Sequence, residues 1–231
     1  LCALLPSPAL PAENLAWRAE GPFLGTVVDV AFDARTPGLA YAAAANGGVF
    51  RSSDDGRNWV AAGRPKTNSS IEWLEVDPGT PGTLWLGVDN PGKPAVWRSR
   101  DQGATWSVVN DDYRGQLATL HPVGYRIAFA PSRPADIWVP STNLHYRSRD
   151  GGKSWSDFRV ENQDVYAMAV DPQNPDIVYA GGHGGEQAHL ARSDDGGKSW
   201  KPVGAGLEPA IVALGVDPAD GSKVYAATRS G

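Results

Sequence analysis

One short motif occurs four times in the chain, and this repetition constrains the fold more than any other feature of the sequence. The motif reads Arg-Ser-x-Asp-x-Gly-x-x-Trp, and successive copies are 47, 49 and 45 residues apart. A regular period of this length is typical of architectures in which each repeat is one supersecondary unit. From serine to tryptophan, the copies cover residues 52–59, 99–106, 148–155 and 193–200.

An apolar run, a turn rich in Asp and Pro, and a second short run precede each motif. Aliphatic, β-branched and aromatic residues within the runs indicate strands, and Pro and Gly between them indicate turns. Each unit is therefore interpreted as four short antiparallel strands, which is one blade of a β-propeller. A fifth blade begins near residue 211 without a following motif. We predict an all-β fold, a β-propeller of four-stranded antiparallel blades with about four and a half blades present and the ring incomplete.

The first twelve residues differ from the rest, because an apolar stretch is followed by small residues and prolines. We expect residues 1–12 to be the remnant of a signal peptide or a disordered tail, and residues 13–231 to be a partial propeller. Residues 14–21 are similar to the stretch that follows each motif, so we expect a closing strand there, of the kind that completes the last blade of a ring. The pattern therefore predicts that the chain is a fragment of a larger propeller.

Composition excludes several classes of function. The chain has 21 basic and 26 acidic side chains, a formal charge of −5, which disfavours a nucleic-acid binder. A single cysteine, Cys2, leaves no intrachain disulfide and no cysteine-based zinc cluster. No run of eighteen apolar residues is present, so no transmembrane segment is expected. We expect neither a cofactor nor a bound metal.

The four motifs resemble the Asp-box, or BNR repeat, of the sialidase-like propeller superfamily. Residues 171–181 are similar to xyloglucanase-type glycoside hydrolases and to sortilin-type receptors. The resemblance implies a structural box between the third and fourth strands. In such a turn Ser and Asp can accept backbone hydrogen bonds, Gly permits positive φ, and Trp packs on the blade. The structural residues would be Ser52, Asp54, Gly56, Trp59, Ser99, Asp101, Gly103, Trp106, Ser148, Asp150, Gly152, Trp155, Ser193, Asp195, Gly197 and Trp200.

The motif has two further features to interpret, its aspartates and its arginines. A calcium site is disfavoured because each Asp lies in a separate blade, without the dense oxygen ligands that calcium needs. The arginine that opens each motif is interpreted as a pairing and stacking residue on the blade surface rather than as an anion ligand. These arginines are Arg51, Arg98, Arg147 and Arg192.

Ligands of such propellers meet the face opposite the boxes, where loops connect the blades. We expect candidate residues in the loops 88–95, 110–124 and 181–189. The catalytic candidates are the carboxylates of Asp89, Asp111 and Asp112, and the ligand-binding candidates are Tyr113, His183 and Glu186. Solvated loop acids are the simpler interpretation of the carboxylates. His183 with His189 would form a metal or acid–base site only with further ligands.

The enzyme patterns of the superfamily are not matched at the positions that can be checked. Sialidases carry Arg-Ile-Pro before the first box, whereas residues 125–128 read Tyr-Arg-Ile-Ala after the second, so Arg126 is interpreted as a strand-edge residue. Xyloglucanase-type hydrolases place an Asp before a Gly-Gly pair in the first blade. Here that position is Ala45. An apolar side chain cannot serve as the acid or base that glycoside hydrolysis requires.

We therefore expect a secreted or periplasmic propeller, monomeric at full length, that binds a glycan or protein on its loop face without catalysis. The alternative is a glycoside hydrolase, xyloglucanase-like or exo-sialidase-like, whose catalytic residues are displaced or lie outside this fragment. It requires a carboxyl pair on the loop face. A third hypothesis, an assembly factor for a membrane complex, requires an Arg-rich patch that the acidic balance does not favour.

Overall fold

The structure is a computed structural model that describes residues 25–67, 69–89, 95–109, 126–140, 144–160, 164–184, 187–204 and 210–229. Within these ranges the chain forms antiparallel sheets whose strands are paired in chain order. Four sheets have four strands and the fifth has two. The predicted all-β fold of four-stranded antiparallel sheets is confirmed.

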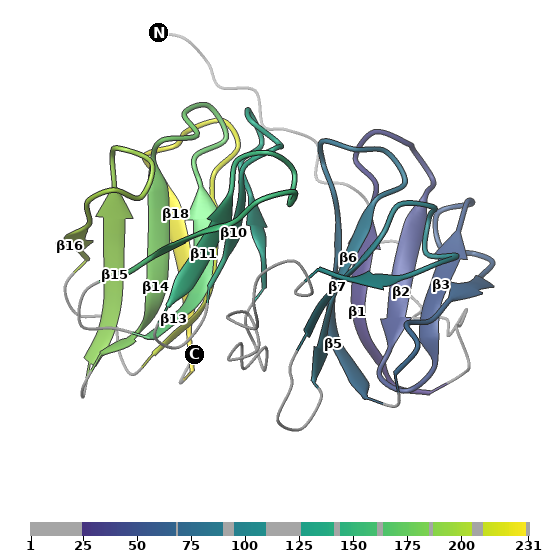
Figure 1. Ribbon diagram of the computed structural model, residues 1–231. Coiled ribbons are helices and arrows are strands. Elements are labelled where there is room, and N and C mark those ends of the chain that lie inside the picture. The colour runs from purple at the N-terminus through teal and green to yellow at the C-terminus, as the bar shows by residue number, and fades with distance from the viewer. Residues whose placement is uncertain are drawn as a thin grey trace, which may run out of the picture.

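The sheets are numbered here from the N-terminal end (Figure 1). The first comprises β1 (Val27–Phe32), β2 (Ala40–Ala44), β3 (Gly48–Ser52) and β4 (Val60–Gly63). The second comprises β5 (Ser70–Val76), β6 (Leu84–Asp89), β7 (Ala95–Ser99) and β8 (Ser107–Val108). The third comprises β9 (Ala128–Phe129), β10 (Ile137–Val139), β11 (His145–Ser148) and β12 (Ser156–Phe158). The fourth comprises β13 (Asp164–Val170), β14 (Val178–Gly184), β15 (Gln187–Ser193) and β16 (Lys201–Val203), and the fifth β17 (Ile211–Val216) and β18 (Val224–Thr228).

The core lies between successive sheets, because the second, third and fourth sheets each have a neighbouring sheet on both faces. Alternate residues of a strand point to opposite faces. In β6, Leu84 and Leu86 pack toward the first sheet, whereas Trp85 packs toward the third. In β10, Ile137 faces the second sheet and Trp138 the fourth. Burial on both faces explains why these short strands are apolar throughout rather than alternating.

The fifth sheet packs against the fourth at a position that only glycine allows. A Cβ atom at Gly181 of β14 would lie 2.6 Å from Cγ2 of Ile211 and 3.0 Å from Cδ1 of Leu214. Such distances are below van der Waals contact, so the absent side chain lets β17 approach the fourth sheet.

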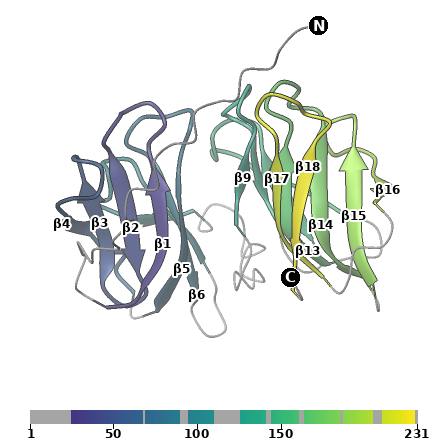
Figure 2. The ribbon, with the colours of Figure 1, turned by 180° about the vertical axis from the view of Figure 1, so that it is seen from behind.

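The sheets form a row that does not close into a ring among the described residues. Figures 1 and 2 show the first two sheets on one side of the molecule and the third to fifth on the other. The end faces of the row are apolar and exposed, with Phe32 of β1 69% exposed and Tyr225 of β18 62% exposed. No helix long and apolar enough to span a membrane is found in the described part of the chain.

Candidate functional site

The repeated motif forms the turn between the third and fourth strands of each four-stranded sheet. In the third sheet, Ser148 Oγ accepts hydrogen bonds from the backbone N–H groups of Asp150 and Gly152 and donates one to Asp150 Oδ1. Asp150 in turn accepts hydrogen bonds from the backbone N–H groups of Lys153 and Ser154 and from the Ser154 hydroxyl. The same Ser–Asp network recurs in the other three turns.

These hydrogen bonds keep the turn carboxylates ionised. The side-chain amide of Asn58 is the largest cause that lowers the pKa of Asp54 to about 2. Hydroxyl groups of Thr105, Ser154 and Ser199 likewise hold the pKa values of Asp101, Asp150 and Asp195 below the usual range of aspartate. A carboxylate that is ionised at neutral pH and already occupied by several donors is unsuited to proton transfer. The Ser and Asp side chains of the turns therefore hold the backbone in place, and we assign them no catalytic role.

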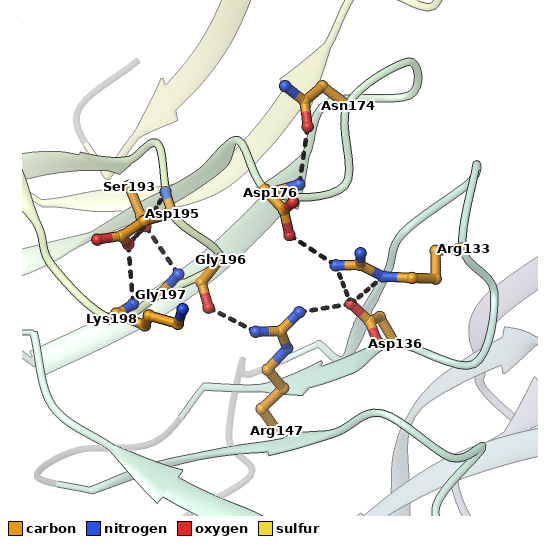
Figure 3. Close-up of polar contacts among 10 residues, drawn as sticks. All are labelled: Arg133, Asp136, Arg147, Asn174, Asp176, Ser193, Asp195, Gly196, Gly197 and Lys198. Carbon is orange, nitrogen blue, oxygen red and sulfur yellow. Dashed lines mark hydrogen bonds and ion pairs between the residues drawn. The ribbon is translucent and has the colours of Figure 1, made fainter.

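The arginines that open the first three motifs each contact the next sheet. Arg98 donates a hydrogen bond to the carbonyl oxygen of Gly151, 3.1 Å away, and its guanidinium lies over the Trp85 ring. Arg147 donates hydrogen bonds to the carbonyl oxygen of Gly196 and to Asp136 (Figure 3). Its guanidinium lies 4.2 Å from the centroid of the Trp138 ring. Arg51 contacts Gln102 of the second sheet. Three of the four arginines thus hydrogen-bond to the next sheet while stacking, where they stack, on a ring of their own sheet. Arg192 pairs with Asp194 and Tyr179 within the fourth sheet.

The first strands of four sheets surround a cavity of about 580 Å³, which we call the inner cavity. Such a volume is within the range of small-ligand sites. Its walls are mostly apolar, and the charged groups among its described residues are Glu72, Glu75 and Arg126. The lining residues are Glu72, Trp73, Glu75, Arg126, Ile127, Ala128, Phe129, Tyr166, Ala167, Met168, Ala169, Val170, Val212, Ala213 and Leu214.

A charged trio connects the first three sheets at this cavity. Arg126, which precedes β9, makes an ion pair with Asp29 of β1 and a second one with Glu75 of β5, where Nη1 and Oε1 are 3.0 Å apart. Asp29 Oδ2 also accepts a hydrogen bond from the backbone N–H of Leu74 at 2.8 Å. Its side chain is only 9% exposed, and Asp29 does not line the cavity. The cavity therefore presents Glu75 and Arg126, with Asp29 behind them.

Glu75 is the titratable group of this trio whose protonation state is sensitive near neutral pH. Burial raises its pKa from the ordinary value of 4.5 to about 7, against the lowering effect of Arg126 and with a further rise from Asp29. A carboxyl group that titrates near pH 7 inside a cavity is a recognised mark of a functional position.

Among the sequence-predicted ligand-binding residues, His183 is described by the structure and does not line the inner cavity. Asp111, Asp112, Tyr113 and Glu186 lie outside the described residues, as does the expected closing strand at 14–21. The loop bounds predicted around two other candidates were wrong. Asp89 is the last residue of β6, and His183 lies within β14, which runs to Gly184 because it pairs with β15 over its full length.

Sequence reasoning missed the charged trio. Arg126 was interpreted as a strand-edge residue, but it is an ion-pair partner of two other sheets. The available signal was the presence of single charges of opposite sign in or beside apolar first strands, namely Asp29, Glu75 and Arg126. These three residues do not occupy equivalent positions in their repeats, so the spacing of the repeats does not predict that they meet. No group of three or more His, Cys, Asp or Glu able to hold a metal is found where the structure is described.

Comparison with known proteins identifies the class and the family. A solved structure of an ancestral GH74 enzyme superposes with a TM-score of 0.69 at 21% identity, covering 91% of this chain and 28% of that one. This likeness confirms the β-propeller fold. The Sortilin-Vps10 family model, described as sortilin, neurotensin receptor 3, matches residues 94–229. The chain therefore belongs to the Sortilin-Vps10 family.

Two of the curated relatives have different functions. Vacuolar protein sorting/targeting protein 10 of Sordaria macrospora is 42% identical over 99 residues, which are 40% of this chain and 6% of that protein. The oligoxyloglucan-reducing end-specific xyloglucanase of Emericella nidulans is 26% identical over 181 residues, which are 71% of this chain and 22% of that protein. The chain thus spans less than a quarter of the length of either relative.

Proposed function

We propose that the chain is the ligand-binding propeller segment of a secreted or lumenal protein, and that it binds a protein or peptide in the inner cavity without catalysis. The observation that carries the proposal is the composition of that cavity. Mostly apolar walls with a few polar groups at one place are typical of sites that bind a ligand by burial and orient it by charge.

The family supports a protein ligand. The matching model carries the names sortilin and neurotensin receptor 3, and the Vps10 relative is named for protein sorting and targeting. Propellers of this family and the xyloglucanase relatives also support a secreted or lumenal location, as does the signal-like composition of residues 1–12.

The arrangement of charges disfavours catalysis. Glycoside hydrolysis needs two carboxyl groups that both reach the substrate, one as acid and one as base or nucleophile. At the inner cavity, Glu75 is held by Arg126, and the neighbouring Asp29 is occupied by Arg126 and the Leu74 backbone. The only other carboxyl group among the described lining residues is Glu72.

A glycoside hydrolase is the second candidate function, and one observation favours it. A carboxyl group with a pKa near 7 beside a second carboxylate is the usual arrangement of a general acid and its partner in glycosidases. The xyloglucanase relative cited above fits this candidate.

One experiment separates the two candidates. The purified chain is used to select peptides from a display library, and the same preparation is incubated with xyloglucan oligosaccharides. The proposal predicts enriched peptides that compete with one another and no release of new reducing ends.

Reducing ends that appear with the chain and disappear in Glu75→Gln, but persist in the exposed control Asp55→Asn, would establish the hydrolase instead. A library that yields no enriched peptide would contradict the proposed function.

A further inference from the structure

Two grooves between successive sheets have the same construction at the repeated turns. The first groove, of about 500 Å³, lies between the second and third sheets and contains Arg98, Arg100 and Lys153. The second groove, of about 470 Å³, lies between the third and fourth sheets. It contains the equivalent residues Arg147, Arg149 and Lys198, together with Arg159. Each groove therefore gathers basic side chains from two sheets on a chain whose net charge is −5.

Most of these cations have no acidic partner of their own. Arg147 is buried and paired with Asp136 (Figure 3), and Arg98 is held by the Gly151 carbonyl. The others are exposed, and none of them takes part in an ion pair among the described residues: Arg100, Lys153, Arg149, Arg159 and Lys198.

The acidic groups of the first groove are occupied by internal donors. Asp77 accepts hydrogen bonds from the backbone N–H groups of Gly79 and Thr80 and from Trp85 Nε1. Asp150 is occupied by its own turn. The acidic residue that lines the second groove is the exposed Asp157. It shares the groove with four basic residues, Arg147, Arg149, Arg159 and Lys198. Both grooves are therefore short of anionic partners.

The outer interfaces of the row lack this chemistry. The residue between Ser and Asp of the motif is Arg100 in the second copy and Arg149 in the third, but Ser53 in the first and Asp194 in the fourth. The basic character is thus confined to two adjacent interfaces, and the turn itself does not require it.

We propose that the two grooves bind one linear sulfated polysaccharide, with a sulfated sugar unit in each groove. Guanidinium groups match sulfate and carboxylate oxygens in a bidentate manner. Each groove has the volume of a small-molecule site rather than the flat area of a protein interface, which favours separate anionic units along a polymer. Half-buried Phe158 adds an apolar surface for a sugar ring in the second groove.

The test is titration calorimetry with a heparin-derived octasaccharide at low and at physiological ionic strength. The variant that combines Arg100→Ser and Arg149→Ser copies the serine of the first motif, whose turn folds with it. We expect its affinity to fall about tenfold, because two exposed ion pairs are lost. Affinity of the unmodified chain is expected to fall as salt is raised.

The matched control combines Arg57→Ser with Lys201→Ser, which removes the same charge from exposed positions outside the grooves. We expect it to keep the affinity of the unmodified chain. Equal losses in both double variants, or no binding at low ionic strength, would overturn the proposal. A poly-glutamate peptide that binds as tightly as the octasaccharide, and loses affinity in the same variant, would assign the grooves to acidic proteins instead. None of these outcomes depends on the inner cavity.

Discussion

The repeated turns and the inner cavity use charge in opposite ways. Each turn contains the same Ser–Asp network, and every carboxylate in it is occupied by donors from its own turn. The inner cavity contains one trio, Asp29, Glu75 and Arg126, contributed by three different sheets. Residues that recur in all four motifs build the turns, whereas the trio at the cavity combines charges that are not repeated from sheet to sheet. The invariant positions of the repeat therefore serve structure, and ligand specificity is expected from positions that vary between the sheets.

The largest expected effect is at a turn interface. Asp136 is 1% exposed and pairs with the buried Arg147 and with Arg133 (Figure 3). Asp136→Ala leaves Arg147 buried without its counter-ion, so we expect a loss of about 3–5 kcal/mol in the free energy of unfolding. Urea unfolding measures it.

The control uses the same arginine. Asp176 binds Arg133 at 2.8 Å but is 49% exposed, so Asp176→Ala is expected to cost less than about 1 kcal/mol. Similar costs for both variants would contradict the view that burial makes the interface essential.

A second prediction concerns adjacent glycines in the third turn. Both Gly151 and Gly152 have positive φ, but a Cβ atom at Gly152 would lie 2.7 Å from Trp85 of the second sheet, whereas one at Gly151 meets nothing within 4 Å. We expect Gly151→Ala to cost about 1 kcal/mol through the backbone alone and Gly152→Ala about 2–3 kcal/mol. Thermal unfolding of both variants checks the order. Equal costs would mean that the turn does not pack against the neighbouring sheet as described.

The third prediction tests the inner cavity through pH. The pKa of Glu75 is about 7 in the folded chain and 4.5 as its ordinary value. Between these values the folded state binds more protons than the unfolded state, so this residue makes stability fall as pH rises through the window. Glu75→Gln stays neutral. We expect the variant to gain about 2 kcal/mol over the unmodified chain at about pH 8 and little at about pH 5.

Urea unfolding at both pH values gives the comparison. A difference between variant and unmodified chain that does not change with pH would show that Glu75 is ionised throughout, and that the cavity does not raise its pKa.

The sequence predicted the repeat-based part of this molecule well. The four-stranded antiparallel sheets follow from the spacing of the Arg-Ser-x-Asp-x-Gly-x-x-Trp motif, because each copy is a local unit with its own hydrogen bonds. The strand Ala40–Ala44 forms where the repeat predicts one, although alanine favours helices.

The cavity could not be predicted in the same way. Asp29 and Arg126 are far apart in the sequence, and only the stacking of three sheets brings them together. The bounds around His183 were wrong because glycines were interpreted as a loop, although the pairing of β14 with β15 extends through them. Long-range pairing, rather than local composition, decides both cases.

The most direct test of the account is the affinity of a library-selected peptide for two cavity-related variants. Ala213 of β17 is exposed and lines the inner cavity, so Ala213→Trp fills the cavity from an unburied position. Val60 of β4 is 59% exposed and lies outside it, so Val60→Trp is the matched control. We predict at least about a tenfold loss of affinity for Ala213→Trp and none for Val60→Trp. Equal affinities for the two variants would contradict the assignment of ligand binding to the inner cavity.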